Sequence, residues 1–160
     1  MAIMRKGKMA SLDWARLADL AEFRYQLRRF VSFSEGASEA AGISAQQYQL
    51  LQVVATVPPE RESSISYIAE RMVVRHNTAV ELVDRAEKAG LVERVADKND
   101  HRRSLVEITS HGNDLLAELV PIHLAEVRTG DGELLRSLQR LIGTKAASSK
   151  RGTEKRGIER

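Results

Sequence analysis

The fold of this chain is decided by residues 65–109, which read ISYIAERMVVRHNTAVELVDRAEKAGLVERVADKNDHRRSLVEIT. The first eight residues repeat apolar side chains at steps of three and four, which predicts a short helix capped by Ser64 or Ser66. A second helix is predicted over about 76–89 and ends at Gly90. Its apolar side is formed by Ala79, Leu82, Val83 and Ala86.

Two short strand patterns follow these helices, at 91–96 and 104–109, and the polar, turn-rich segment 97–103 separates them. Two helices joined by a tight turn and followed by a hairpin form a winged helix-turn-helix. The second helix of such a unit fits the major groove of duplex DNA, and the hairpin tip reaches the flanking backbone or minor groove.

Helical patterns flank this unit on both sides and make the fold class mainly α with a small β-hairpin wing. We expect helices over about 11–41 and 45–57, the latter capped by Ser44 and ended by Pro58-Pro59. Two more are expected over about 110–128, capped by Thr109 and kinked at Pro121, and over about 131–142. Residues 1–10 form a flexible basic arm in this interpretation, and 144–160 a basic, disordered tail.

The composition of the sequence excludes several classes of protein function. With 160 residues the chain suits one domain, and its lack of cysteine excludes disulfides, thiolate zinc sites, cysteine nucleophiles and thiol oxidation sensing. No apolar run approaches the roughly 18 residues that span a bilayer, and the basic N-terminus lacks a signal-peptide core. We therefore expect a soluble, cytoplasmic protein. Glycine-rich phosphate loops, nucleophile elbows and metal-ligand spacings are absent from the sequence, so we expect no enzyme, cofactor or metal.

The net charge of +3 is misleading about nucleic acid, because the positive excess lies at the ends. Residues 1–8 carry three basic and no acidic residues, and 144–160 carry six basic and two acidic ones. Residues 9–143 therefore carry a net charge of −4. Any interaction with DNA must depend on where individual charges lie.

Four segments together resemble the MarR family of transcriptional regulators. They are GISAQQYQLL at 42–51, ISYIAERM at 65–72, TAVELVDRAEKAGLV at 78–92, and DHRRSLVEIT at 100–109, which is followed by Gly112. The resemblance covers about 12–143 and implies a winged helix-turn-helix at about 44–109, with dimerisation helices at about 11–41 and 110–142. Ala86 departs from the leucine that is usual in this family, and we expect this smaller residue to loosen the packing behind the recognition helix.

The candidate contacts to DNA lie on the second helix and in the wing. Arg75, His76, Asn77 and Thr78 begin the helix, where free N–H groups favour phosphate; Asn77 could read adenine and Arg75 guanine. Glu81 could accept from cytosine and Arg85 could bind phosphate or a base, but the two could instead form an i, i+4 ion pair.

In the wing, the resemblance implies that Asp100 braces the hairpin and that Arg102 contacts the backbone or minor groove. Arg103 and Lys98 are further candidates for DNA contacts. The alternative is that 97–103 is only a solvated polar turn.

Phe30, Phe33 and Tyr48 are candidates for an effector site, although aromatic residues at helical spacing more often form core and interface. The resemblance implies a phenolic or aromatic-acid effector. We therefore expect a homodimeric repressor that binds a palindromic operator and is released by such an effector. The alternative is a winged-helix module for protein contacts, suggested by the acidic central region and by Glu81 and Asp84.

Overall fold

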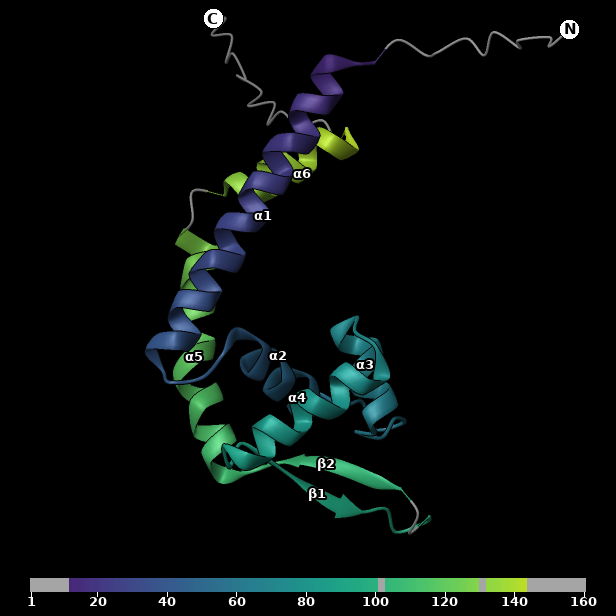
Figure 1. Cartoon of the computed structure of the whole chain (residues 1–160). Coiled ribbons are helices and arrows are strands. Elements are labelled where there is room, and N and C mark those ends of the chain that lie inside the picture. Colours follow the sequence, from purple (N-terminus) through teal and green to yellow (C-terminus); the bar gives the residue numbers. More distant parts are fainter. Residues whose placement is uncertain (1–11, 101–102, 130–131, 144–160) are drawn as a thin grey trace, which may run out of the picture. The chain divides into compact units, whose positions relative to one another are not determined.

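The computed structural model describes residues 12–100, 103–129 and 132–143 and confirms a mainly helical fold with a two-stranded hairpin (Figure 1). The chain divides into two compact units, one of residues 28–131 and one that combines the segments before 28 and after 131. The elements in chain order are α1 (Trp14–Ala40), α2 (Ala45–Ala55), α3 (Ile65–Met72), α4 (His76–Lys88), β1 (Val92–Ala96), β2 (Ser104–Ile108), α5 (Ser110–Thr129) and α6 (Glu133–Ile142).

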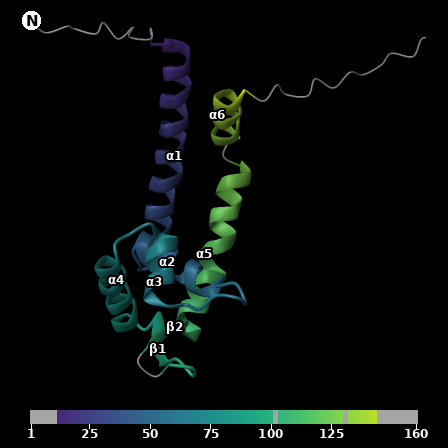
Figure 2. The same cartoon turned by 90° about the vertical axis from the view of Figure 1, so that its right-hand side faces the viewer.

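Helices α2, α3 and α4 form the core of the larger unit, and Figure 2 shows them grouped above the hairpin. Polar caps fix where two of them begin. The Ser44 hydroxyl accepts from the Gln47 N–H at 3.1 Å, while the Gln47 side chain accepts from the Ser44 N–H at 2.9 Å. Ser64, one of the two predicted caps, accepts from the Tyr67 N–H at 3.2 Å and starts α3.

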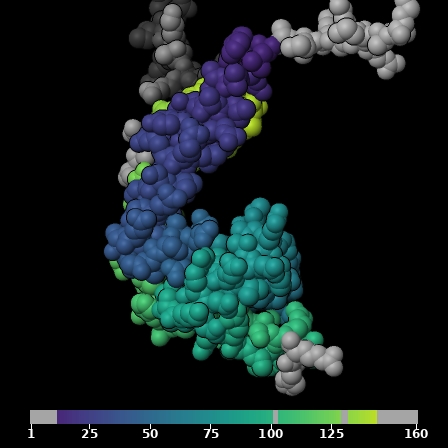
Figure 3. All heavy atoms as spheres, viewed as in Figure 1, coloured from purple at the N-terminus to yellow at the C-terminus, as the bar shows by residue number. Residues whose placement is uncertain are grey.

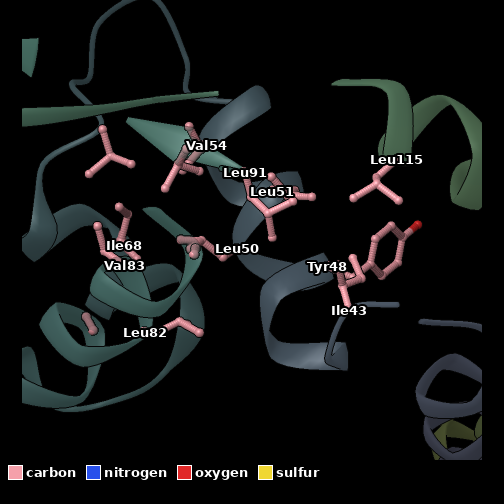
Figure 4. Packing of buried hydrophobic residues seen from close by; sticks show 14 of the residues in the cluster. Ile43, Tyr48, Leu50, Leu51, Val54, Ile68, Leu82, Val83, Leu91 and Leu115 are labelled. Carbon is pink, nitrogen blue, oxygen red and sulfur yellow. The ribbon is translucent and has the colours of Figure 1, made fainter. Parts of the chain in front are cut away.

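The side chains between these helices are almost completely buried (Figure 4). Because this apolar cluster includes one side of α4, burial fixes which side of that helix faces outward. The largest fully buried apolar residues are Tyr48, Leu50, Leu51, Ile68, Val83, Leu91, Val92, Val106 and Leu119.

The hairpin is antiparallel, with Val92 opposite Ile108 and Ala96 opposite Ser104. The segment before α3 joins its edge, because the Val106 N–H donates to the Ser63 carbonyl at 3.0 Å and Ser64 bridges Leu105. The wing is therefore attached to the start of α3 as well as to the end of α4.

Thr109 joins the wing to α5, as predicted. Its hydroxyl oxygen lies 2.6 Å from the Gly90 carbonyl oxygen and accepts from the Gly112 N–H at 3.1 Å. Helix α5 then continues through Pro121.

The smaller unit contains the first half of α1 and α6, with Arg140 Nε 3.6 Å from Asp19 Oδ1. Its apolar side chains are largely exposed in the single chain. The most exposed are Leu12, Trp14, Leu135 and Ile142.

Gly112 has no room for a side chain. A Cβ atom there would lie 2.3 Å from the Leu91 carbonyl oxygen and within 3 Å of side-chain atoms of Ile108 and Leu51. We expect Gly112→Ala to lower the free energy of unfolding by about 2–3 kcal/mol, because α5 must move away from the wing. Urea denaturation at fixed protein concentration measures this change.

Gly36→Ala is the matched control, because Gly36 lies inside α1 and a Cβ atom added there would meet nothing within 4 Å. Alanine there should raise the free energy of unfolding by about 0.5–1 kcal/mol. Equal effects of the two substitutions would contradict the close packing at Gly112.

Candidate nucleic-acid interface

The turn between α3 and α4 carries an exposed valine in an unusual backbone conformation. Val73 ends α3 with φ 56° and ψ 44°, in the left-handed region, and its side chain is 90% exposed. For a β-branched residue this conformation costs about 1–2 kcal/mol. The turn is therefore held by the packing of the helices on either side of it.

Helix α4 begins directly after this turn without a side-chain cap. Arg75 occupies the N-cap position, and its side chain accepts no hydrogen bond from the first turn. Uncapped N–H groups and the positive end of the helix dipole together form a site that favours anions.

All six candidate side chains of α4 are exposed. Within the part of the chain that the structure describes, none has a side-chain hydrogen bond or ion pair, and the alternative pair between Glu81 and Arg85 is not formed. The set can therefore meet a partner together: Arg75, His76, Asn77, Thr78, Glu81 and Arg85. In Figure 3 the surfaces of α3, α4 and the hairpin adjoin one another on the larger unit.

The wing candidates lie in different environments. Lys98 is exposed and has no side-chain partner among the described residues, whereas Arg102 lies outside the described residues. Arg103 is held within the chain: its Nη2 donates to Glu62 Oε2 at 3.0 Å, and its Nη1 lies 3.7 Å from Asp97 Oδ2.

Asp97 is a structural residue that sequence reasoning assigned only to a polar turn. It is only 1% exposed, and its Oδ1 accepts from the Asn99 N–H at 2.8 Å. The Asp97 N–H donates to the Arg103 carbonyl at 3.1 Å, and the Arg103 N–H donates to the Asp100 carbonyl at 2.9 Å. The first part of the turn is therefore an ordered structure built around a buried carboxylate.

Arg94 is the second residue that sequence reasoning missed. Its guanidinium lies between two carboxylates of α4, with Nη2 2.6 Å from Asp84 Oδ1 and Nη1 2.5 Å from Glu87 Oε2. Partial burial acts to lower the pKa of Arg94, but the hydrogen bonds and charges of Asp84 and Glu87 outweigh it and raise the pKa above its ordinary value. Asp84 is therefore already paired within the chain, although its side chain remains 46% exposed, which weakens the expectation that favoured a protein-contact surface.

The alternation of inward and outward side chains along β1 indicates that Arg94 points toward the protein interior. Val92 and Arg94 share one face of the strand, and Val92 is buried. An arginine on an inward face requires a partner.

Two of the three effector candidates meet around a buried histidine, His123 of α5. Its ring stacks on Tyr48 with centroids 4.4 Å apart, and Phe33 meets it edge-on at 5.7 Å. Because His123 Nδ1 lies 2.8 Å from the Leu119 carbonyl oxygen, it must donate there, while Nε2 lies 2.9 Å from the Ser34 hydroxyl oxygen and shares a hydrogen bond with it.

An open groove of about 520 Å³ runs beside this cluster. Phe33 is among its lining residues and Phe30 is not. The lining is mainly apolar and consists of Ser32, Phe33, Gly36, Ala37, Ala40, Ala41, Glu118 and Ile122.

Other site types find no support in the described residues. Residues 12–100, 103–129 and 132–143 hold no group of three side chains that could bind a metal ion. The same ranges contain no helix with the length and apolarity needed to cross a membrane.

Comparison with known proteins places the chain among transcriptional regulators. A sequence profile of the MarR family matches residues 41–103. A putative transcriptional regulatory protein for the hcr operon of Thauera aromatica is 31% identical over 126 residues, covering 72% of this chain and 74% of that protein.

Solved structures share the fold. Sco3205, a MarR family transcriptional regulator from Streptomyces coelicolor crystallised with DNA, matches with a TM-score of 0.66 and 19% identity, over 88% of this chain and 94% of that one. CouR from Rhodococcus jostii, bound to p-coumaroyl-CoA, matches with a TM-score of 0.59 and 21% identity, over 77% of this chain and 91% of that one.

The Tyr48 hydroxyl is buried without a hydrogen-bond partner among the described residues, and burial raises the pKa of this group above 10.0. Tyr48→Phe removes an unsatisfied donor, so we expect the free energy of unfolding at neutral pH to rise by about 1 kcal/mol. A raised acid pKa means that wild-type stability is lost as pH rises above the ordinary tyrosine value. The advantage of the variant should therefore widen above about pH 10.

Urea denaturation at about pH 7 and about pH 10.5 measures both effects. A variant that is less stable than wild type at both values would show that the hydroxyl has a partner.

Proposed function

The chain belongs to the MarR family of DNA-binding transcriptional regulators, and from this premise we propose that it is a homodimeric repressor that is released from a palindromic operator by a small aromatic effector. The observation that carries the proposal is the uncapped start of α4, with six exposed side chains that have no partner among the described residues. Phosphate suits the free N–H groups, and asparagine and arginine are the side-chain types that pair with adenine and guanine edges, which supports these roles for Asn77 and Arg75.

A dimer is supported by apolar surface that a single chain leaves exposed. In the smaller unit, Trp14 is 73% exposed and Ile142 is 63% exposed. On α5 of the larger unit, Leu124 and Val127 are exposed as well. Large exposed apolar surfaces mark interfaces, and a two-fold dimer places two recognition helices about one DNA turn apart.

Effector release is supported by the groove beside Phe33. Its lining is apolar with two polar groups, Ser32 and Glu118, which suits a small aromatic molecule with a polar substituent. The related fold of CouR was crystallised with p-coumaroyl-CoA, which carries an aromatic acyl group. In this proposal, ligand in the groove favours an arrangement of α1, α2 and α5 in which the two α4 helices no longer match the operator spacing.

Selection of bound duplexes from a random pool should recover a palindromic sequence. Asn77→Ala should then relax the preference at one position of each half-site, by about 1–3 kcal/mol of discrimination. Lys98→Ala and Arg102→Ala should weaken binding to all sequences and reduce the slope of log affinity against log salt by about one each.

Asn113→Ala is the matched control, because Asn113 is an exposed asparagine in the first turn of α5. It should leave both affinity and sequence preference unchanged. If Asn77→Ala binds the selected and scrambled duplexes as wild type does, the assignment of α4 is wrong.

Candidate aromatic acids and phenols, titrated against the complex with the selected duplex, should release the DNA. Phe33→Ala should raise the effector concentration needed for half-release by about tenfold, through loss of an aromatic wall of the groove. Phe30→Ala, which alters a phenylalanine outside the groove, should leave it near the wild-type value. A response that depends on Phe30 and not on Phe33 would place the effector elsewhere.

A further inference from the structure

We propose that Arg94 is a positioning residue that holds the wing at a fixed angle to α4, so that both can engage one duplex together. This inference rests on the DNA contacts proposed for α4 and for the wing. Arg94 acts through Asp84 and Glu87, and we define these three residues as the clamp.

A two-stranded hairpin cannot orient itself. An isolated pair of strands is marginally stable in water, so its direction comes from what it packs against. At the base of the wing, Val92 and Val106 are buried in the core. Arg94 lies opposite Val106 in the register, one step nearer the tip than Val92 on the same face of β1. The clamp is therefore the attachment of β1 to α4 beyond the apolar core.

The hydrogen bonds of Arg94 tie β1 to α4, whereas β2 is joined to the segment before α3. The Arg94 N–H donates to Glu87 Oε1 at 3.0 Å, while the guanidinium reaches Glu87 Oε2 and Asp84 Oδ1. Main chain and side chain of one strand residue are thus both tied to α4. A planar guanidinium held by two carboxylates fixes orientation as well as distance, which a lysine ammonium does not.

The clamp lies on the recognition helix itself. Asp84 and Glu87 flank Arg85, which is exposed and has no partner among the described residues. In this part of α4, the carboxylates of Asp84 and Glu87 therefore face the wing, while Arg85 faces outward. A movement of the wing relative to α4 would change the spacing between Arg85 and Lys98, both of which we propose as DNA contacts.

Positioning by the clamp can be separated from its effect on stability. The side chains of the clamp are 25%, 46% and 39% exposed for Arg94, Asp84 and Glu87. Partly exposed ion pairs contribute little to folding stability. Loss of the clamp should therefore change DNA binding more than unfolding.

The chain offers a matched pair of double variants. Asp84→Asn/Glu87→Gln removes both charged partners of Arg94 and leaves it only neutral amide oxygens, while Glu93→Gln/Glu107→Gln removes two exposed carboxylates that lie opposite each other on the wing. Each double variant replaces two carboxylates by isosteric amides and raises the net charge by the same amount. If charge alone governed binding, both would bind DNA as tightly as wild type or more tightly.

We expect the clamp variant to bind the selected duplex about tenfold more weakly and to lose about one unit of salt slope, because wing phosphates are no longer reached. The Glu93/Glu107 variant should keep the wild-type slope and bind at least as tightly. Arg94→Lys should fall between wild type and the clamp variant. The same series on random-sequence duplex tests the wing without requiring an operator.

Because the chain has no cysteine, spin labels can be placed cleanly at Lys88→Cys and Ser104→Cys. The distance distribution between α4 and the wing should broaden in the clamp variant and not in the Glu93/Glu107 variant. Thermal unfolding and stoichiometric titration with duplex identify any loss of folded protein, which would lower the binding-competent fraction and leave the salt slope unchanged.

Two results would overturn the inference while wild type still binds DNA. One is a clamp variant that binds DNA as tightly as wild type does. Arg94 would then either contact DNA itself once its partners are removed or have no role in DNA binding. The other is an unchanged distance distribution. If wild type itself fails to bind any duplex, the proposed function fails instead.

Discussion

The burial of one side of α4 is the constraint on which the rest of the structure depends. Ala79 and Leu82 pack inward with almost no exposed surface, so the helix can rotate only by exposing apolar area, at about 25 cal/mol per Å². That orientation turns Asn77 and Arg85 outward and turns Asp84 toward the wing. The burial of this apolar side of α4 thus determines which side chains form the candidate DNA-contacting face and which ones pair with the hairpin.

Local patterns predict the elements well because their causes are local. The spacing of apolar residues indicates α3 and α4, and the hydroxyls of Ser44 and Thr109 mark where α2 and α5 begin. The pairs of Arg94 and Arg103 cannot be predicted in the same way, because each joins residues that only the folded arrangement brings together. The sequence therefore suggests Arg103 as a DNA contact, whereas in the structure its guanidinium is already bound by Glu62 and faces Asp97.

The placement of the acidic side chains also explains how a net acidic central region can suit a polyanionic partner. Glu62, Asp84 and Glu87 each meet an arginine from another element, and Asp97 is buried in the turn. Their charges are offset inside the larger unit at short range, where ion pairs are screened least. Among the exposed candidates on α4, by contrast, are two arginines, Arg75 and Arg85, and one acidic residue, Glu81, so this face is not acidic although the region as a whole is.

The same packing connects the neighbourhood of the open groove beside Phe33 to α4. Tyr48 stacks on His123 of α5 at one end of α2, and Leu50 and Leu51, on the same short helix, are buried in the cluster shared with Leu82. Interiors at crystal-like density do not deform continuously, so a displaced Tyr48 ring must move α2 or be accommodated by a new rotamer. Only a movement of α2 is passed on to α4. Such a movement requires a ligand that binds the shifted and the unshifted positions of α2 with different affinity. The side chain that meets both the groove and His123 is Phe33, so its contact with ligand is where such a difference in affinity would arise.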